Sequence, residues 1–190
     1  MFTRSEKPIA RWPALVVLLA CAALAGCQNT PTVPLAEVPD PSQALGAGGI
    51  QWVVASHRGT AAPLSLQDTG DRTFWLNGYL GGTLSYGRFT LTFPAGAVYG
   101  WAQVTIHVPA SALVDCDLSI TPAYLNHFYK PVVLTIDCHG TNVTADNISG
   151  LGIYWKSTNG QWVEVGHDDD PMTLTVSAPL QHFSEYRSGW

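Results

Sequence analysis

The fold is decided by three consecutive segments, Arg88-Phe-Thr-Leu-Thr-Phe93, Pro94-Ala-Gly-Ala-Val-Tyr-Gly100 and Ala102-Gln-Val-Thr-Ile-His-Val108. In the first and last of these segments apolar residues alternate with polar ones, the period of a strand with one buried face. The middle segment is rich in proline and glycine, which end strands and form turns. We therefore predict two half-buried strands joined by a turn.

The same pattern continues through the rest of the chain, and no window shows a helical period. Strands recur roughly every 10 residues, which favours an antiparallel β-sandwich or barrel, and we predict an all-β, antiparallel β-sandwich over residues 79–190. Ser157-Thr-Asn-Gly160 is a hairpin signal, and the tryptophans beside it, Trp155 and Trp162, are expected to pack together. Further strands are predicted at 118–122, 132–137, 152–156, 162–165, 172–176 and 183–186.

Residues 50–78 are interpreted as an N-terminal β extension. Trp52-Val-Val-Ala55 and Thr73-Phe-Trp-Leu76 have strand composition, and a polar loop separates them. The sequence leaves open whether they join the sandwich.

The first 26 residues differ from the rest. Arg4, Lys7 and Arg11 precede an almost entirely apolar run that ends in small residues. The run is shorter than the roughly 20 residues that span a bilayer core as a helix. Basic start, apolar run and small residues are typical of a secretory signal peptide, predicted at 1–26. A short membrane anchor or a buried helix is the alternative.

Leu24-Ala-Gly-Cys27 resembles the lipobox of bacterial lipoprotein precursors. The resemblance implies cleavage between Gly26 and Cys27, a diacylglycerol thioether on Cys27 and a further acyl chain such as palmitate on its freed amine. Two or more chains anchor a protein stably, whereas one does so only marginally. The expected location is the cell envelope. Gln28 after the cysteine favours the outer membrane, with the module facing the periplasm or the cell surface.

Residues 27–49 are predicted to be a lipidated N-terminus and a linker. The segment carries Pro31, Pro34, Pro39 and Pro41, followed by three glycines. Such a composition buries no core and behaves as a tether. A largely extended tether of this length reaches on the order of 60–70 Å.

Charge disfavours nucleic-acid binding. The chain has 9 basic and 14 acidic side chains. Three of the bases and one of the acids lie in the predicted signal, so the mature chain would carry a formal net charge of −7. No basic patch with interleaved aromatics is present, and nucleic-acid binding depends on clustered Lys and Arg.

Two cysteines stay in the predicted mature domain, Cys116 and Cys138. Because disulfides persist in an export compartment, we predict a bridge between them that contributes on the order of 3 kcal/mol. Two free buried thiols are the alternative. No metal-ligand spacing accompanies these cysteines, so no metal is expected.

From Gly81 the chain resembles the ZU-five domain, named from zonula-occludens proteins and the Unc-five netrin receptors. The resemblance rests on an ordered series of short strand-like segments and covers about residues 79–187. It implies a β-sandwich interaction module without a defined chemistry. The segments are Gly81-Gly-Thr-Leu, Gly87 to Ala97, Ala102 to Ile106, Lys130 to Ile136, Leu151 to Trp155, Gly160 to Glu164 and His182 to Tyr186.

His182-Phe183-Ser184 is the one sharp candidate for chemistry. In some relatives of this domain the chain cuts itself at such a motif. The Ser184 hydroxyl would attack the Phe183 carbonyl, and His182 could act as base. The alternative, which we prefer, is that Phe183 belongs to the core and the motif is structural.

Other polar groups form no recognisable catalytic set. His167-Asp168-Asp169-Asp170 could ligate a cation, but a solvated hairpin turn explains it better. Exposed tryptophans could stack on sugar rings, although about half are expected in the core. We therefore expect a non-enzymatic, cofactor-free interaction or structural module with an envelope protein or glycan as partner. Self-cleavage and carbohydrate binding or hydrolysis are the alternatives, and the oligomeric state is open.

Overall fold

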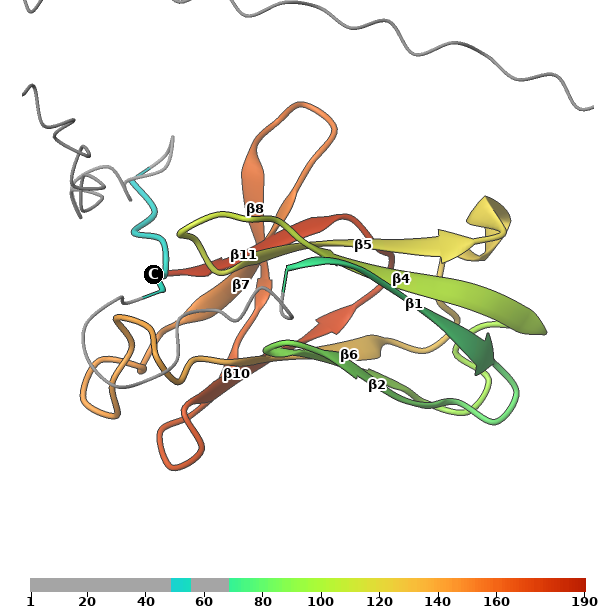
Figure 1. Ribbon diagram of the computed structural model, residues 1–190, viewed down its shortest axis with the longest axis horizontal. Helices are drawn as coiled ribbons and strands as arrows, with labels where there is room; N and C mark the ends of the chain where they lie inside the picture. The colour runs from blue at the N-terminus through green and yellow to red at the C-terminus, as the bar shows by residue number, and fades with distance from the viewer. Residues whose placement is uncertain (1–48, 56–68) are drawn as a thin grey trace, which may run out of the picture. The chain divides into compact units, whose positions relative to one another are not determined.

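The computed structural model describes residues 49–55 and 69–190 (Figure 1). The predicted signal at 1–26, the cleavage site Gly26–Cys27 and the predicted linker up to residue 48 lie outside the described residues. The described residues comprise parts of the predicted β extension and the whole of the domain that follows it.

The described chain is an all-β sandwich of two antiparallel sheets, which confirms the predicted fold class. The six-stranded sheet has the order β1 (Gly70–Asn77), β4 (Trp101–Val108), β5 (Asp115–Thr121), β11 (Glu185–Gly189), β7 (Gly152–Lys156) and β8 (Trp162–Gly166). The five-stranded sheet has the order β2 (Gly82–Tyr86), β3 (Phe89–Phe93), β6 (Val132–Asp137), β10 (Thr175–Leu180) and β9 (Asp168–Asp170). Figure 1 shows the two sheets as two layers.

Alternation along β3 and β4 builds the core as predicted. Phe89 and Leu91 in β3 are fully buried beside Ile136 and Leu134, their partners in β6. Val104 in β4 is fully buried in the other sheet, and it belongs to the same core cluster. Each such side chain contributes about 1.5–3 kcal/mol when it leaves water.

The turn around Asn159 forms the predicted hairpin between β7 and β8. Gly160 has a φ of 80°, its N–H donates to the Ser157 carbonyl at 2.8 Å, and the Ser157 N–H donates to the Gln161 carbonyl at 2.8 Å. The predicted pairing of Trp155 with Trp162 is wrong. Trp155 lies opposite Val163, so Trp162, one residue earlier, points to the other face of the sheet.

Two edge strands differ from the sequence prediction. β2 was not among the strands predicted from the alternation of apolar residues, because Gly82-Thr-Leu-Ser-Tyr86 has only one aliphatic residue, yet it pairs along its whole length with β3. The acidic run Asp168–Asp170 is the short strand β9 and not a turn, since it pairs with β10 at the edge of the sheet. An edge strand tolerates charges, which also discourage pairing with other chains.

The predicted N-terminal β extension is part of the same sandwich in the described structure. β1 is the edge strand beside β4, with Gly70 opposite Val108 and Asn77 opposite Trp101. Trp52 bridges Gly189 next to the C-terminus. The Gln51 N–H donates to the Trp190 carbonyl at 3.2 Å, and the Trp190 N–H donates back at 3.0 Å.

Candidate binding site

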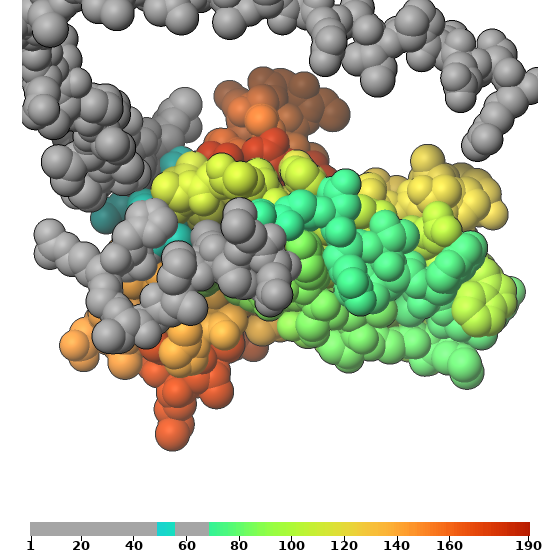
Figure 2. All heavy atoms as spheres, in the orientation of Figure 1, coloured from blue at the N-terminus to red at the C-terminus, as the bar shows by residue number. Residues whose placement is uncertain are grey.

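Exposed tyrosines surround a depression at one end of the sandwich, which we call the tyrosine depression. Its volume is about 220 Å³, and it is lined by Tyr79, Val98, Tyr99, Gly100, Tyr124, Leu125, His127 and Tyr129. The lining comes from the turn after β1, the loop before β4, the 3-10 helix Ala123–Leu125 and the loop before β6. In Figures 1 and 2 these loops lie at the right-hand end, in green, yellow-green and yellow.

Backbone hydrogen bonds tie these loops to one another. The Gly78 N–H donates to the Gly100 carbonyl at 2.8 Å, and the Gly96 N–H donates to the Gly78 carbonyl at 2.8 Å. The Tyr129 N–H donates to the Ala97 carbonyl at 2.9 Å. Three segments far apart in sequence therefore hold one another in place before any ligand arrives.

Gly78 makes the closest of these approaches. A Cβ at this position would lie 2.2 Å from the Val98 carbonyl oxygen and 2.4 Å from a Val98 methyl carbon, so only glycine fits without a backbone shift. Val98 is 1% exposed and forms the floor of the depression. The turn that carries Tyr79 is thus fixed to the loop that carries Tyr99.

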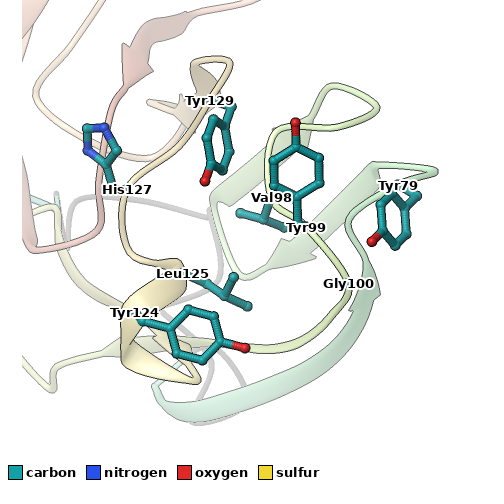
Figure 3. Close-up of a pocket in the computed structure, with 8 residues that line it drawn as sticks. All are labelled: Tyr79, Val98, Tyr99, Gly100, Tyr124, Leu125, His127 and Tyr129. Atoms are coloured by element: carbon teal, nitrogen blue, oxygen red, sulfur yellow. The ribbon is translucent and has the colours of Figure 1, made fainter.

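Three tyrosines form a row, as Figure 3 shows, with Tyr124 across from them. The ring centroids of Tyr79 and Tyr99 are 6.0 Å apart, and those of Tyr99 and Tyr129 are 4.6 Å apart in an edge-to-face arrangement. Tyr99 is 53% exposed and Tyr124 is 80% exposed. Large aromatic surfaces at this exposure stay available to a ligand.

The lining contains no Asp, Glu, Lys or Arg side chain. Its polar groups are four phenol hydroxyls, the His127 ring and backbone atoms. Lys130 is nearby in sequence, but its ammonium donates to the Ala95 carbonyl at 2.6 Å. The depression offers aromatic faces and neutral hydrogen-bonding groups, a combination suited to binding an uncharged polar ligand.

A second cluster lies on the outer face of the six-stranded sheet. The Arg187 guanidinium is 4.5 Å from the Trp162 ring centroid and 5.3 Å from that of Trp52. Its Nη2 donates to Asp115 at 3.1 Å and to Glu185 at 3.3 Å. Trp52 is buried, so this cluster fastens the N-terminal segment to the sheet.

Three carboxyl groups border this arginine. Burial raises the pKa of Asp115, while its hydrogen bond from Ser111 and its pairing with Arg187 oppose that effect. Burial and the neighbouring Glu185 raise the pKa of Asp117, which lies directly opposite Glu185 on the adjacent strand. The positive charges of Lys156 and Arg187, together with His107, oppose this rise in the pKa of Asp117. Lys156 also pairs with Glu185 at 2.8 Å, and Arg187 pairs with Asp115. These contacts fit a structural ion-pair network.

The His182-Phe183-Ser184 motif joins the core to the six-stranded sheet. Phe183 is buried, and its ring centroid lies 4.8 Å from that of Phe128. The Ser184 hydroxyl donates to the Lys156 carbonyl at 3.2 Å, and the His182 ring packs against Trp155 at 4.6 Å. Phe183 therefore belongs to the core, as expected from the sequence.

The predicted disulfide between Cys116 and Cys138 is not formed, which corrects that expectation. Both are free, fully buried thiols. Cys116 lies in β5 of the six-stranded sheet, whereas Cys138 follows β6 of the five-stranded sheet. The Cys138 thiol instead donates to the Ile136 carbonyl within its own sheet, at 3.8 Å.

No cation site forms at the acidic run. Asp170 accepts hydrogen bonds from the Met172 N–H and the Thr173 hydroxyl, both at 2.8 Å, and these bonds lower its pKa. Within residues 49–55 and 69–190, no three His, Cys, Asp or Glu residues converge as a metal site would require.

The tyrosine depression was not predicted from the sequence. Its residues stand in loops, where no period marks which way a side chain points. One signal was present: Gly78-Tyr79 and Tyr99-Gly100 place aromatics directly beside glycines in turn segments. Aromatics in such turns have no strand face to bury them, and this could have indicated exposure.

Comparison of the sequence with protein-family models finds no match, and comparison with curated proteins finds none either. The likeness to the ZU-five domain and to bacterial lipoproteins therefore stays a prediction. In the described part of the chain, no helix has the length and hydropathy of a membrane span.

Proposed function

We propose that this chain is a non-catalytic binding module of the bacterial cell envelope, anchored to a membrane through lipid on Cys27. The observation that carries the proposal is the tyrosine depression. Tyr79, Tyr99, Tyr124 and Tyr129 are each more than half exposed, and loops that are hydrogen-bonded to one another present them together.

Clustered exposed aromatics point to binding because they are unfavourable in water. Isolated apolar residues are common on protein surfaces, but contiguous patches mark interaction sites. Tyrosine is enriched at such sites, since it adds a large contact area with few rotatable bonds and a polar tip. Trp75 and Trp101, at 68% and 64% exposure, lie on the neighbouring strands β1 and β4 and do not line the depression.

The position of the depression suits a tethered module. Residues 49–55 lie beside the C-terminus, at the end of the sandwich opposite the tyrosine loops (Figure 1). A tether that enters at Gly49 leaves the depression on the end away from its attachment. A lipid at Cys27 would thus hold the protein at a membrane through the end of the sandwich that does not carry the tyrosines.

Binding to detergent-washed envelopes tests this proposal. All proteins compared carry Cys27→Ser, so that no lipid inserts into the membrane by itself. Each is incubated with envelopes from cells that lack the protein, and the sedimented fraction is measured. We expect Tyr99→Ala/Tyr129→Ala to lose most of the sedimentation, while Trp75→Ala, a matched exposed aromatic outside the depression, retains it. Equal sedimentation of all three proteins, or none by the protein with intact tyrosines, would overturn the proposal.

A further inference from the structure

We infer that the tyrosine depression is a saccharide subsite that binds a short stretch of an uncharged glycan chain. This inference rests on the proposed function, because it names the ligand class of the same site. Its first basis is charge. The lining carries no acidic or basic side chain other than His127, within a chain of formal net charge −5. An anionic ligand would be repelled by the chain as a whole, and a cationic ligand would find no carboxylate partner in the lining.

The second basis is the match between the tyrosine side chains of the lining and the surface of a sugar ring. Four of the lining side chains are phenols, each with an aromatic face and a hydroxyl at its tip. A pyranose ring has the complementary surface, with C–H groups on its faces and hydroxyls around its edge. The two aliphatic lining residues, Val98 and Leu125, are 1% and 7% exposed, so the accessible surface is aromatic and polar.

The third basis is size and shape. At about 220 Å³ the depression is smaller than the roughly 300–1,000 Å³ of enclosed small-molecule pockets. The row of Tyr79, Tyr99 and Tyr129 runs along one rim, with centroid spacings of 6.0 and 4.6 Å, and Tyr124 lies across from it (Figure 3). An open depression with a row of rings suits part of a chain that continues on both sides.

A proline-rich peptide is the main competitor for such a surface, since those peptides dock on aromatic-lined grooves. The hydroxyl-rich lining favours the saccharide. A peptide of that kind offers few hydrogen-bond donors, and the four phenols and the His127 ring would then lack partners for their acceptor positions.

The test titrates the purified protein with three uncharged probes, the hexasaccharides of cellulose, chitin and amylose, and with a proline decapeptide. We expect at least one saccharide to bind and the peptide not to. Tyr99→Ala and Tyr129→Ala should each weaken that binding at least about fivefold, because truncating an aromatic side chain at the centre of an interface commonly costs more than about 1 kcal/mol. Tyr99→Phe should weaken it less, because it keeps the ring, and Trp75→Ala should leave it unchanged.

These substitutions spare the core, and an unchanged urea unfolding midpoint checks the fold of each variant. Two outcomes overturn the inference: no saccharide binds, or a saccharide binds equally to the unaltered protein and to Tyr99→Ala/Tyr129→Ala. The envelope assay separates this failure from that of the proposed function. If sedimentation with envelopes depends on the tyrosines but no saccharide binds, the proposed binding function is supported and only the proposed ligand class is wrong.

Discussion

The side chain of Asn126 makes two hydrogen bonds to the backbone of Phe183. Its Oδ1 accepts the Phe183 N–H at 2.6 Å, and its Nδ2 donates to the Phe183 carbonyl at 3.0 Å. Asn126 follows the 3-10 helix that carries Tyr124, whereas Phe183 precedes β11. One amide thus joins the tyrosine end of the molecule to its central strand.

Replacing Asn126 by Ala should lower the free energy of unfolding by about 2 kcal/mol. The Phe183 N–H loses its partner, and the Phe183 carbonyl keeps only the 3.3 Å contact with the His182 ring. Asn126→Asp should also destabilise the fold, since a carboxylate keeps the acceptor but cannot donate to the Phe183 carbonyl. Urea unfolding measures both. Asn159→Ala, in the exposed β7–β8 turn, is the control. A cost at Asn126 no larger than that at Asn159 would contradict this role.

The bond between Phe183 and Ser184 should stay intact in the purified protein. The Ser184 hydroxyl donates to the Lys156 carbonyl, and the Phe183 carbonyl accepts from Asn126. β11 lies between β5 and β7, so a released C-terminal piece would stay bound in the sheet, and the measurement must be made on denatured protein. Intact mass should show one unclipped species. A clip that Ser184→Ala abolishes would establish self-cleavage instead.

Both core thiols should be present and unreactive in the folded protein. Burial raises the pKa of Cys116, and burial raises the pKa of Cys138 to about 11, so neither is a thiolate at neutral pH. In the full chain with Cys21→Ser and Cys27→Ser, a thiol reagent at pH 8 should label little protein until urea is added, and then two thiols per chain. Absence of labelling in urea, relieved by a reductant, would show a disulfide.

The raised pKa of the Cys138 thiol predicts that the folded protein loses stability at alkaline pH. The Cys138 pKa is 9.0 as the ordinary value and about 11 in the fold, so between these pH values the native state holds the extra proton. The contribution of this group is complete below pH 9 and disappears as the pH rises through about 11. Urea midpoints at pH 8, 10 and 11 should therefore fall more steeply for the unaltered chain than for Cys138→Ala.

Arg187 should be poorly replaced by lysine. Its flat guanidinium contacts two tryptophan rings and reaches two carboxylates at once, which a lysine ammonium cannot do. We expect Arg187→Lys to lower the free energy of unfolding by about 1–2 kcal/mol. Arg72→Lys is the matched control, since Arg72 lies 5.8 Å from the Phe74 ring on the edge strand β1. Equal effects would show that the stacking adds nothing.

Runs of β-branched and aromatic residues, with period-two alternation in several of them, made the paired core strands predictable. Val132–Asp137 and Gly152–Lys156 were predicted with the bounds that they have in the structure. Edge strands such as β2 and β9 were not predicted in this way. They are held by pairing with a neighbouring strand rather than by burial of their own side chains. The tyrosine depression depends on which loops meet at one end, and such long-range contacts leave no local pattern.

The lipid on Cys27 would decide where the module works. Cells grown with labelled palmitate and expressing the unaltered chain, Cys27→Ser or Cys21→Ser supply the measurement. Label should enter the unaltered chain and Cys21→Ser, whose altered residue lies in the part predicted to be removed, and should be lost in Cys27→Ser. Label that persists in Cys27→Ser, or that never enters the unaltered chain, would contradict a lipid-anchored module.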